Sequence, residues 1–284
     1  MGICTRATPT NILLLNLTVS DLLFLLFLPL KMYEAASDMR WYLPSSICII
    51  TSFFFFSTIY ASSLLLMAVA VDRYLGVTFP IRYKLHRRPM HGIAASVLAW
   101  IVSGGHTFTL FFIQGSPQGI AIVENHHVCY ENFTSEQLQI VLPLRLEISV
   151  VLFFVPLLVS ALCYARLIAI LCGMPEMSRQ KKQRAVAMAA GTLLVYLVCF
   201  LPFNISHIFS FDHGNSAPWR SYTLLLTATN TVLDPIIFYF SSAAFQASLR
   251  TILTQSWRSS SSCLLGAAHQ DTGPTERQGH LSHL

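Results

Sequence analysis

The chain has 284 residues, of which 54% are hydrophobic and only 11% are charged, and its formal net charge is +5. Soluble domains carry about a quarter charged residues, so this composition excludes an ordinary soluble protein and indicates lipid as the solvent. The cysteines stand singly, without a Cys-x-x-Cys pair, which argues against a zinc site or a redox motif.

Six apolar stretches are suited to crossing a membrane, because a spanning helix needs roughly 20 predominantly apolar residues. In chain order they cover residues 12–32, 47–71, 92–113, 148–165, 185–211 and 222–240. The sequence therefore predicts an all-α membrane protein with six spanning helices.

Basic residues show which loops face the cytoplasm. Five Lys and Arg residues lie between residues 72 and 89, and five more lie between 165 and 185. The loop 114–139 has no Lys or Arg and carries three glutamates. By the positive-inside rule the first two loops are cytoplasmic and the third is outside. The start of the chain and the tail are then cytoplasmic as well.

The chain divides into a membrane bundle over residues 1–242 and a polar end. Residues 243–257 are expected to form an amphipathic helix on the membrane surface, with Phe245, Leu249 and Ile252 on one face. Residues 258–284 are rich in Ser, Gly and His and are expected to be a disordered cytoplasmic tail.

Five short motifs carry a family resemblance, in the expected order and on the expected spans. They are Asn16-Leu17-x-x-Ser20-Asp21-Leu22, Asp72-Arg73-Tyr74, Trp100, Cys199-Phe200-Leu201-Pro202 and Asp234-Pro235-Ile236-Ile237-Phe238-Tyr239. Together they resemble the signatures of rhodopsin-like G-protein-coupled receptors. The resemblance implies a seven-transmembrane receptor bundle of which family helices two to seven are present. The first family helix, with its Asn-bearing motif, is expected to be missing from this sequence.

Finer segments narrow the resemblance to the free fatty acid receptor family, and within it most to the short-chain, type 2 receptors. These segments are 34–37, 40–44, 129–133, 142–147, 204–207 and 218–220. The resemblance runs from about residue 11 to 242. It implies a multi-pass plasma-membrane receptor that binds a short-chain fatty acid outside and a heterotrimeric G protein inside, without a cofactor.

Two arginines at the outer ends of spans, Arg145 and Arg220, are candidate ligand residues. The planar guanidinium group matches a carboxylate, so two converging arginines suit a small anion. Alternatively, both side chains extend to the membrane interface and pair with Glu131 or Glu147. The residues alone favour neither view.

The resemblance implies that both arginines hold the carboxylate together with His106 and His207. A lone histidine on an apolar face can instead simply bond a neighbouring helix. Tyr60 and Glu131 also match pocket positions of the family. Phe56 and Phe203 stand where the type 2 receptor has tyrosines, and Phe111 replaces an aliphatic residue, so chain-length preference stays open.

Other motif residues imply a switch and an ion site. Asp72, Arg73 and Tyr74, with Asp234 and Pro235, match the family's G-protein switch, although Arg73 could be only a boundary charge. Asp21 and Asn230 match positions that the wider family places around a sodium ion and waters. Interhelical hydrogen bonds are the alternative for this pair.

Two features belong to the outer face. Cys48 and Cys129 both lie on the oxidising side of the membrane, where a bridge is plausible, and they match the family's disulfide. Asn132-Phe133-Thr134 is an outward-facing glycosylation sequon.

Two rival functions are open. A six-span carboxylate transporter would often show repeated halves, which this sequence lacks, and would leave the motifs unexplained. A truncated receptor-like protein that does not signal is the second rival. Either an upstream exon that encodes the first helix is missing from this sequence, or the product itself is truncated. An enzyme is not expected, because no zinc-ligand spacing, phosphate-binding Gly loop or nucleophile motif occurs.

Overall fold

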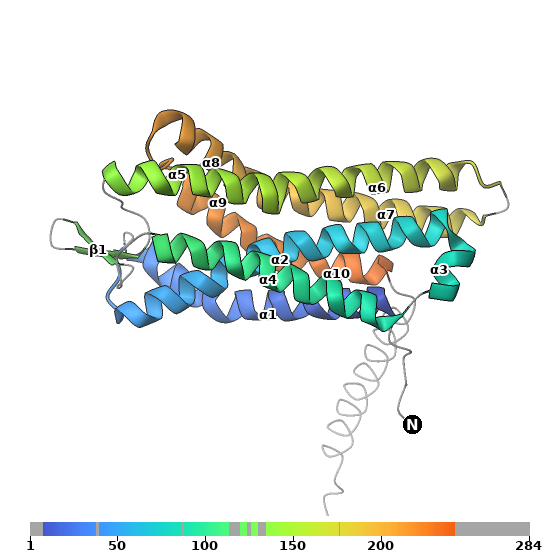
Figure 1. Ribbon diagram of the computed structural model, residues 1–284, viewed down its shortest axis with the longest axis horizontal. Helices are drawn as coiled ribbons and strands as arrows, with labels where there is room; N and C mark the ends of the chain where they lie inside the picture. The colour runs from blue at the N-terminus through green and yellow to red at the C-terminus, as the bar shows by residue number, and fades with distance from the viewer. Residues whose placement is uncertain are drawn as a thin grey trace, which may run out of the picture. The chain divides into compact units, whose positions relative to one another are not determined.

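The computed structural model describes residues 8–37, 40–86, 88–113, 120–123, 126–129, 135–175 and 177–241. These residues form a bundle of long helices with one small β-hairpin (Figure 1). The first helices are α1 (Pro9–Ala36), α2 (Ser45–Thr78), α3 (Pro80–His86) and α4 (Pro89–Ile113). The predicted all-α membrane fold is confirmed, and the hairpin is its one addition among the described residues.

The middle of the chain forms two long, nearly unbroken rods. The first joins α5 (Ser135–Ser149), the π-helical turn η1 (Val150–Phe154) and α6 (Val155–Cys172). The second joins α7 (Arg179–Leu194), the π-helical turn η2 (Val195–Phe200) and α8 (Leu201–His213). Each π-helical turn lies just before a proline, Pro156 or Pro202. Because proline lacks an N–H and clashes with the preceding turn, a locally widened turn accommodates it.

In the described part of the chain, four helices are long and apolar enough to cross a membrane by length and composition: Pro9–Ala36, Ser46–Thr78, Leu138–Cys172 and Lys182–His213. The third predicted span lies in α4. The sixth is divided among α9 (Arg220–Leu226), the 3-10 turn η3 (Thr227–Thr229) and α10 (Asn230–Ser241). All six predicted stretches are therefore helical.

One predicted boundary is wrong. The sequence placed an outer loop at 114–139 and the start of the fourth span at 148, yet α5 begins at Ser135. Polar residues such as Arg145 lowered the apolar signal there, although a helix inside a bundle can carry charge on its protein-facing side. The preceding loop holds the antiparallel strands β1 (Ile120–Val123) and β2 (His126–Cys129).

The expected disulfide is confirmed. Cys129 at the end of β2 is bonded to Cys48 in the first turn of α2, with the sulfur atoms 2.03 Å apart. Both cysteines are buried beside Trp41. The bridge ties the hairpin to the outer end of α2.

Helix α2 is the centre of the bundle and packs against α1, α4 and α6. Its inward residues Leu65 and Leu66 are fully buried, together with Phe153, Tyr196 and Phe200 from the two rods. Large apolar side chains also point outward, among them Leu22, Leu26, Ile101, Leu158 and Leu162. Such an apolar outer surface suits contact with lipid rather than water.

The loops predicted to be cytoplasmic and the loop predicted to be outside lie at opposite ends of the bundle. The hairpin and the α8–α9 turn lie at one end, and α3 and the α6–α7 turn lie at the other (Figure 1). The second end carries the basic loops and is the cytoplasmic end. The predicted segments 243–257 and 258–284 lie outside the described residues, so the division of the chain stays a prediction.

Candidate functional site

A cluster of buried polar side chains lies near the outer end of the bundle. Arg145 comes from α5, Arg220 from the first turn of α9, His207 from α8 and Tyr60 from α2. Their exposed fractions are 4%, 2%, 3% and 4% in that order. Tyr60 and His207 each lie close enough to both guanidinium groups to interact with their charges. The arginines thus point into the protein and do not extend to the membrane interface.

Two stacked phenylalanine rings lie beside Arg220. Its guanidinium carbon is 5.9 Å from the centre of the Phe56 ring and 5.6 Å from that of Phe203. The two rings are 6.4 Å apart and nearly parallel. A cation over an aromatic face is attracted by the ring quadrupole. The Phe203 ring also meets His207 edge to face at 4.6 Å, so the aromatic pair orients two of the four polar groups.

Arg145 also reaches the α8–α9 turn, where its Nη1 donates to Ser216 Oγ at 3.4 Å. The turn is held to α8 because the Ala217 N–H donates to Ser210 Oγ at 3.0 Å. Gly214 in this turn has a left-handed φ of 68°, which glycine adopts without steric cost. Ser216 was not foreseen from the sequence, since only the folded turn brings it to Arg145.

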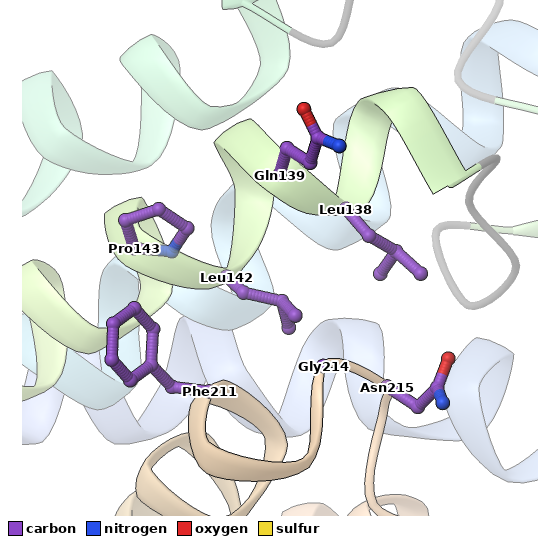
Figure 2. Close-up of a pocket in the computed structure, with 7 residues that line it drawn as sticks. All are labelled: Leu138, Gln139, Leu142, Pro143, Phe211, Gly214 and Asn215. Carbon is purple, nitrogen blue, oxygen red and sulfur yellow. The ribbon is translucent and has the colours of Figure 1, made fainter.

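A groove of about 390 Å³ lies between α5 and the α8–α9 turn. Figure 2 shows Leu138 and Leu142 of α5 facing Phe211 and the turn at Gly214 and Asn215. Gln139 and Pro143 complete its lining. The groove is lined by residues of α5 and α8, the helices that also carry Arg145 and His207, but none of the four cluster residues lines it.

His106 occupies a different place from the cluster. Its Nδ1 lies 2.8 Å from the Val102 carbonyl oxygen on the same helix, and its Nε2 lies 3.4 Å from Glu147 Oε1. The two side chains are 31% and 45% exposed. His106 thus bridges α4 and α5 at the bundle surface, and its role in ligand binding stays a prediction. Glu131, the sequon at Asn132 and the side chain of Phe111 lie outside what the structure describes.

The predicted switch motif lies at the cytoplasmic end of α2. Asp72 accepts hydrogen bonds from Thr10 Oγ1 of α1 at 2.5 Å and from the Tyr83 hydroxyl of α3 at 2.6 Å. Arg73 and Tyr74 follow it as half-buried residues. The two hydroxyl partners were missed by the sequence reasoning, because neither belongs to a recognisable motif.

Asp21, Asn230 and Asp234 meet inside the bundle. Asn230 Nδ2 donates to Asp21 Oδ1 at 3.4 Å, which joins α10 to α1. Asp234 is fully buried and lies beside the Asp21 carboxyl group, and no N–H or hydroxyl group within the described residues donates to its oxygens. A buried carboxylate without donors is costly. Asp21 and Asp234 thus bring two carboxyl groups together, and the sodium ion that the family resemblance implies beside Asp21 and Asn230 stays a prediction. Pro235 follows Asp234 inside α10.

Comparison with known proteins gives consistent matches. Residues 4–238 match the family described as 7 transmembrane receptor (rhodopsin family). Free fatty acid receptor 2 of Mus musculus is 46% identical over 259 residues, which cover 89% of this chain and 77% of that receptor. Free fatty acid receptor 3 of Mus musculus is 43% identical and covers 87% and 77%. Free fatty acid receptor 1 of Macaca fascicularis is 32% identical and covers 82% and 80%.

Proposed function

Because the chain belongs to the rhodopsin family of seven-transmembrane receptors, and within it to the free fatty acid receptors, we propose that its ligand is a short-chain fatty acid. The protein is a multi-pass plasma-membrane receptor, and its family signals through heterotrimeric G proteins and is not enzymatic. The observation that carries the proposal is the buried cluster of Arg145, Arg220, His207 and Tyr60, which converges from four helices.

The cluster suits a single carboxylate. Two permanent positive charges in a poorly solvated region repel each other, and an anion between them removes part of that repulsion. A guanidinium group can donate two parallel hydrogen bonds to a carboxylate. His207 and Tyr60 supply further donors beside the arginines.

The aromatic pair suits a short apolar tail. Phe56 and Phe203 present ring faces next to Arg220 and have no hydroxyl groups of their own. A tail of a few carbons would bury its surface against the partly exposed Phe56 ring at about 25 cal/mol per Å². The head and the tail of the ligand would therefore be recognised by adjacent parts of one site.

Ligand contact can be passed to the cytoplasmic end because α8 continues through η2 into α7 and α9 continues through η3 into α10. His207 and Phe203 lie on α8, directly after Pro202 and the π-helical turn η2. A ligand that binds one arrangement of these helices more tightly shifts the population toward it. In the proposed active arrangement, Arg73 of the switch motif meets the G protein.

The experiment replaces Arg145 or Arg220 with Ala and measures G-protein activation by propionate at matched surface expression. Loss of a charged hydrogen-bond partner contributes about 1.5–3 kcal/mol, so potency should fall by about 10- to 150-fold. His207→Ala should also lose potency, whereas His213→Ala is the matched control, since His213 is exposed at the end of α8. An unchanged propionate response in either arginine variant would contradict the proposal.

A further inference from the structure

A second cavity lies at the cytoplasmic end, at the opposite end from the ligand cluster. It has a volume of about 500 Å³ and is formed by α1, α2, α3 and α4. Its lining residues are Pro9, Asp72, Leu75, Phe79, Arg82, Tyr83, His86 and His91. None of these residues takes part in the proposed binding of the fatty acid.

The cavity combines two apolar lining residues, Leu75 and Phe79, here called its floor, with three exposed lining residues, Arg82, His86 and His91, here called its rim. Leu75 and Phe79 line the floor and are 39% and 48% exposed. Arg82, His86 and His91 are exposed side chains along the rim. An apolar floor beside cationic groups is suited to an amphiphile with an anionic head and an apolar chain.

The carboxylate of Asp72, which also lines the cavity, repels an anionic head group only weakly. Asp72 already accepts hydrogen bonds from Thr10 at 2.5 Å and from Tyr83 at 2.6 Å. Both bonds direct its carboxylate toward neighbouring helices. Besides Asp72 and the Tyr83 hydroxyl group, the polar side chains of the lining are Arg82, His86 and His91. Arg82 therefore offers a permanent positive charge to a ligand, and the two histidines can donate hydrogen bonds to it.

The position of the cavity favours a membrane phospholipid over a soluble anion as its ligand. It lies among the basic cytoplasmic loops, and exposed apolar side chains flank it on α3 and α4, including Ile81, Met90 and Ile93. The cytoplasmic leaflet holds anionic phospholipids, and basic pockets between helices on that side bind their head groups. A soluble anion would leave the apolar floor unused.

We propose that this cavity binds one anionic phospholipid of the inner leaflet, with the head group at Arg82, His86 and His91 and an acyl chain across Leu75 and Phe79. The bound lipid would lie against the Tyr83 ring, whose hydroxyl group bonds Asp72 of the switch motif.

The test titrates the purified full-length receptor in neutral detergent with phosphatidylserine or phosphatidylcholine and measures the retained lipid by native mass spectrometry. One phosphatidylserine should be retained in preference to phosphatidylcholine. Arg82→Gln should weaken its retention by about five-fold, the effect of one basic residue at an anionic membrane surface. Lys84→Gln is the matched control, because Lys84 lies on the same helix, is exposed and does not line the cavity. It should change retention by less than about two-fold.

A second variant keeps every charge and fills the floor. Leu75→Trp should also lose the lipid. If Arg82→Gln fails to fold in a thermal unfolding measurement, Leu75→Trp alone tests the proposal, and unchanged retention of the lipid would overturn it. Equal losses in Arg82→Gln and Lys84→Gln would show diffuse attraction and overturn the proposal. Full competition by soluble glycerophosphoserine at the same concentration as the lipid would also overturn it, since the acyl chain would then contribute nothing.

Discussion

Phe203→Leu separates the role of the aromatic ring under Arg220 from the role of its bulk. Leucine keeps most of the apolar volume of this fully buried side chain but has no ring quadrupole. The guanidinium carbon lies 5.6 Å from the Phe203 ring centre and 5.9 Å from that of Phe56, both within the range of about 6 Å for a cation–π contact. In this desolvated place one such contact contributes about 1–2 kcal/mol.

Without the ring, Arg220 is less well held before the ligand arrives, so binding must order it. Propionate potency should therefore fall by about 5- to 30-fold in a G-protein activation assay at matched surface expression. Phe55→Leu is the control, because Phe55 is equally buried and packs on Phe24. It should change potency by less than about two-fold.

A double-mutant cycle then tests the reasoning. If the ring acts through the guanidinium group, Phe203→Leu should have little further effect once Arg220 is replaced by Ala. An equal loss of potency from Phe203→Leu in both backgrounds, or equal losses from the Phe203 and Phe55 variants, would refute the cation–π argument.

Three further predictions concern stability. Tyr196→Phe removes a buried hydroxyl group that donates to a main-chain carbonyl of α2 at 2.5 Å, so the free energy of unfolding should fall by about 1 kcal/mol and the thermal midpoint of the purified protein should drop. Gly92→Ala would place a Cβ 2.7 Å from a backbone oxygen of α1 and should reduce surface expression, measured by flow cytometry, whereas Gly105→Ala meets nothing within 4 Å and should not. Cys48→Ser removes the bridge to Cys129, which should cost about 2–5 kcal/mol and lower surface expression; normal expression would contradict a structural role.

Some features of this protein could be predicted because they depend on local sequence. The length of each apolar run decides whether a helix can cross lipid, and all six predicted runs are helical. The basic loops predict the orientation, since Lys and Arg residues are kept on the cytoplasmic side. Cys48 and Cys129 could be paired because both lie on the oxidising face.

The boundary error at α5 shows where this local reasoning fails. Hydropathy treats Arg145 as a residue that interrupts a span, yet its side chain is 4% exposed and is directed into the protein. A charged residue is compatible with a membrane helix when it faces the bundle interior. Which side of the helix faces inward depends on its neighbours and not on the charge itself.

The residues of the candidate site likewise could be predicted only in part from the sequence. The sequence named Arg145, Arg220, His207 and Tyr60, and the structure brings these four together. It also named His106, which the structure places beside Glu147. A residue's depth along a helix can be counted from the sequence, whereas its direction around the helix axis is set by packing.

Long-range partners were decided by the tertiary structure alone. Thr10 donates to Asp72 across 62 positions of sequence, and Asn230 donates to Asp21 across 209. Ser216 reaches Arg145 through a turn that no motif marks. The sequence by itself determined the helices, their orientation and the chemical types of the site residues, since these follow from local hydrophobicity, charge and short motifs. Only the packing of the helices decided which polar groups meet, because each contact depends on the relative position and rotation of two helices that are distant in the sequence.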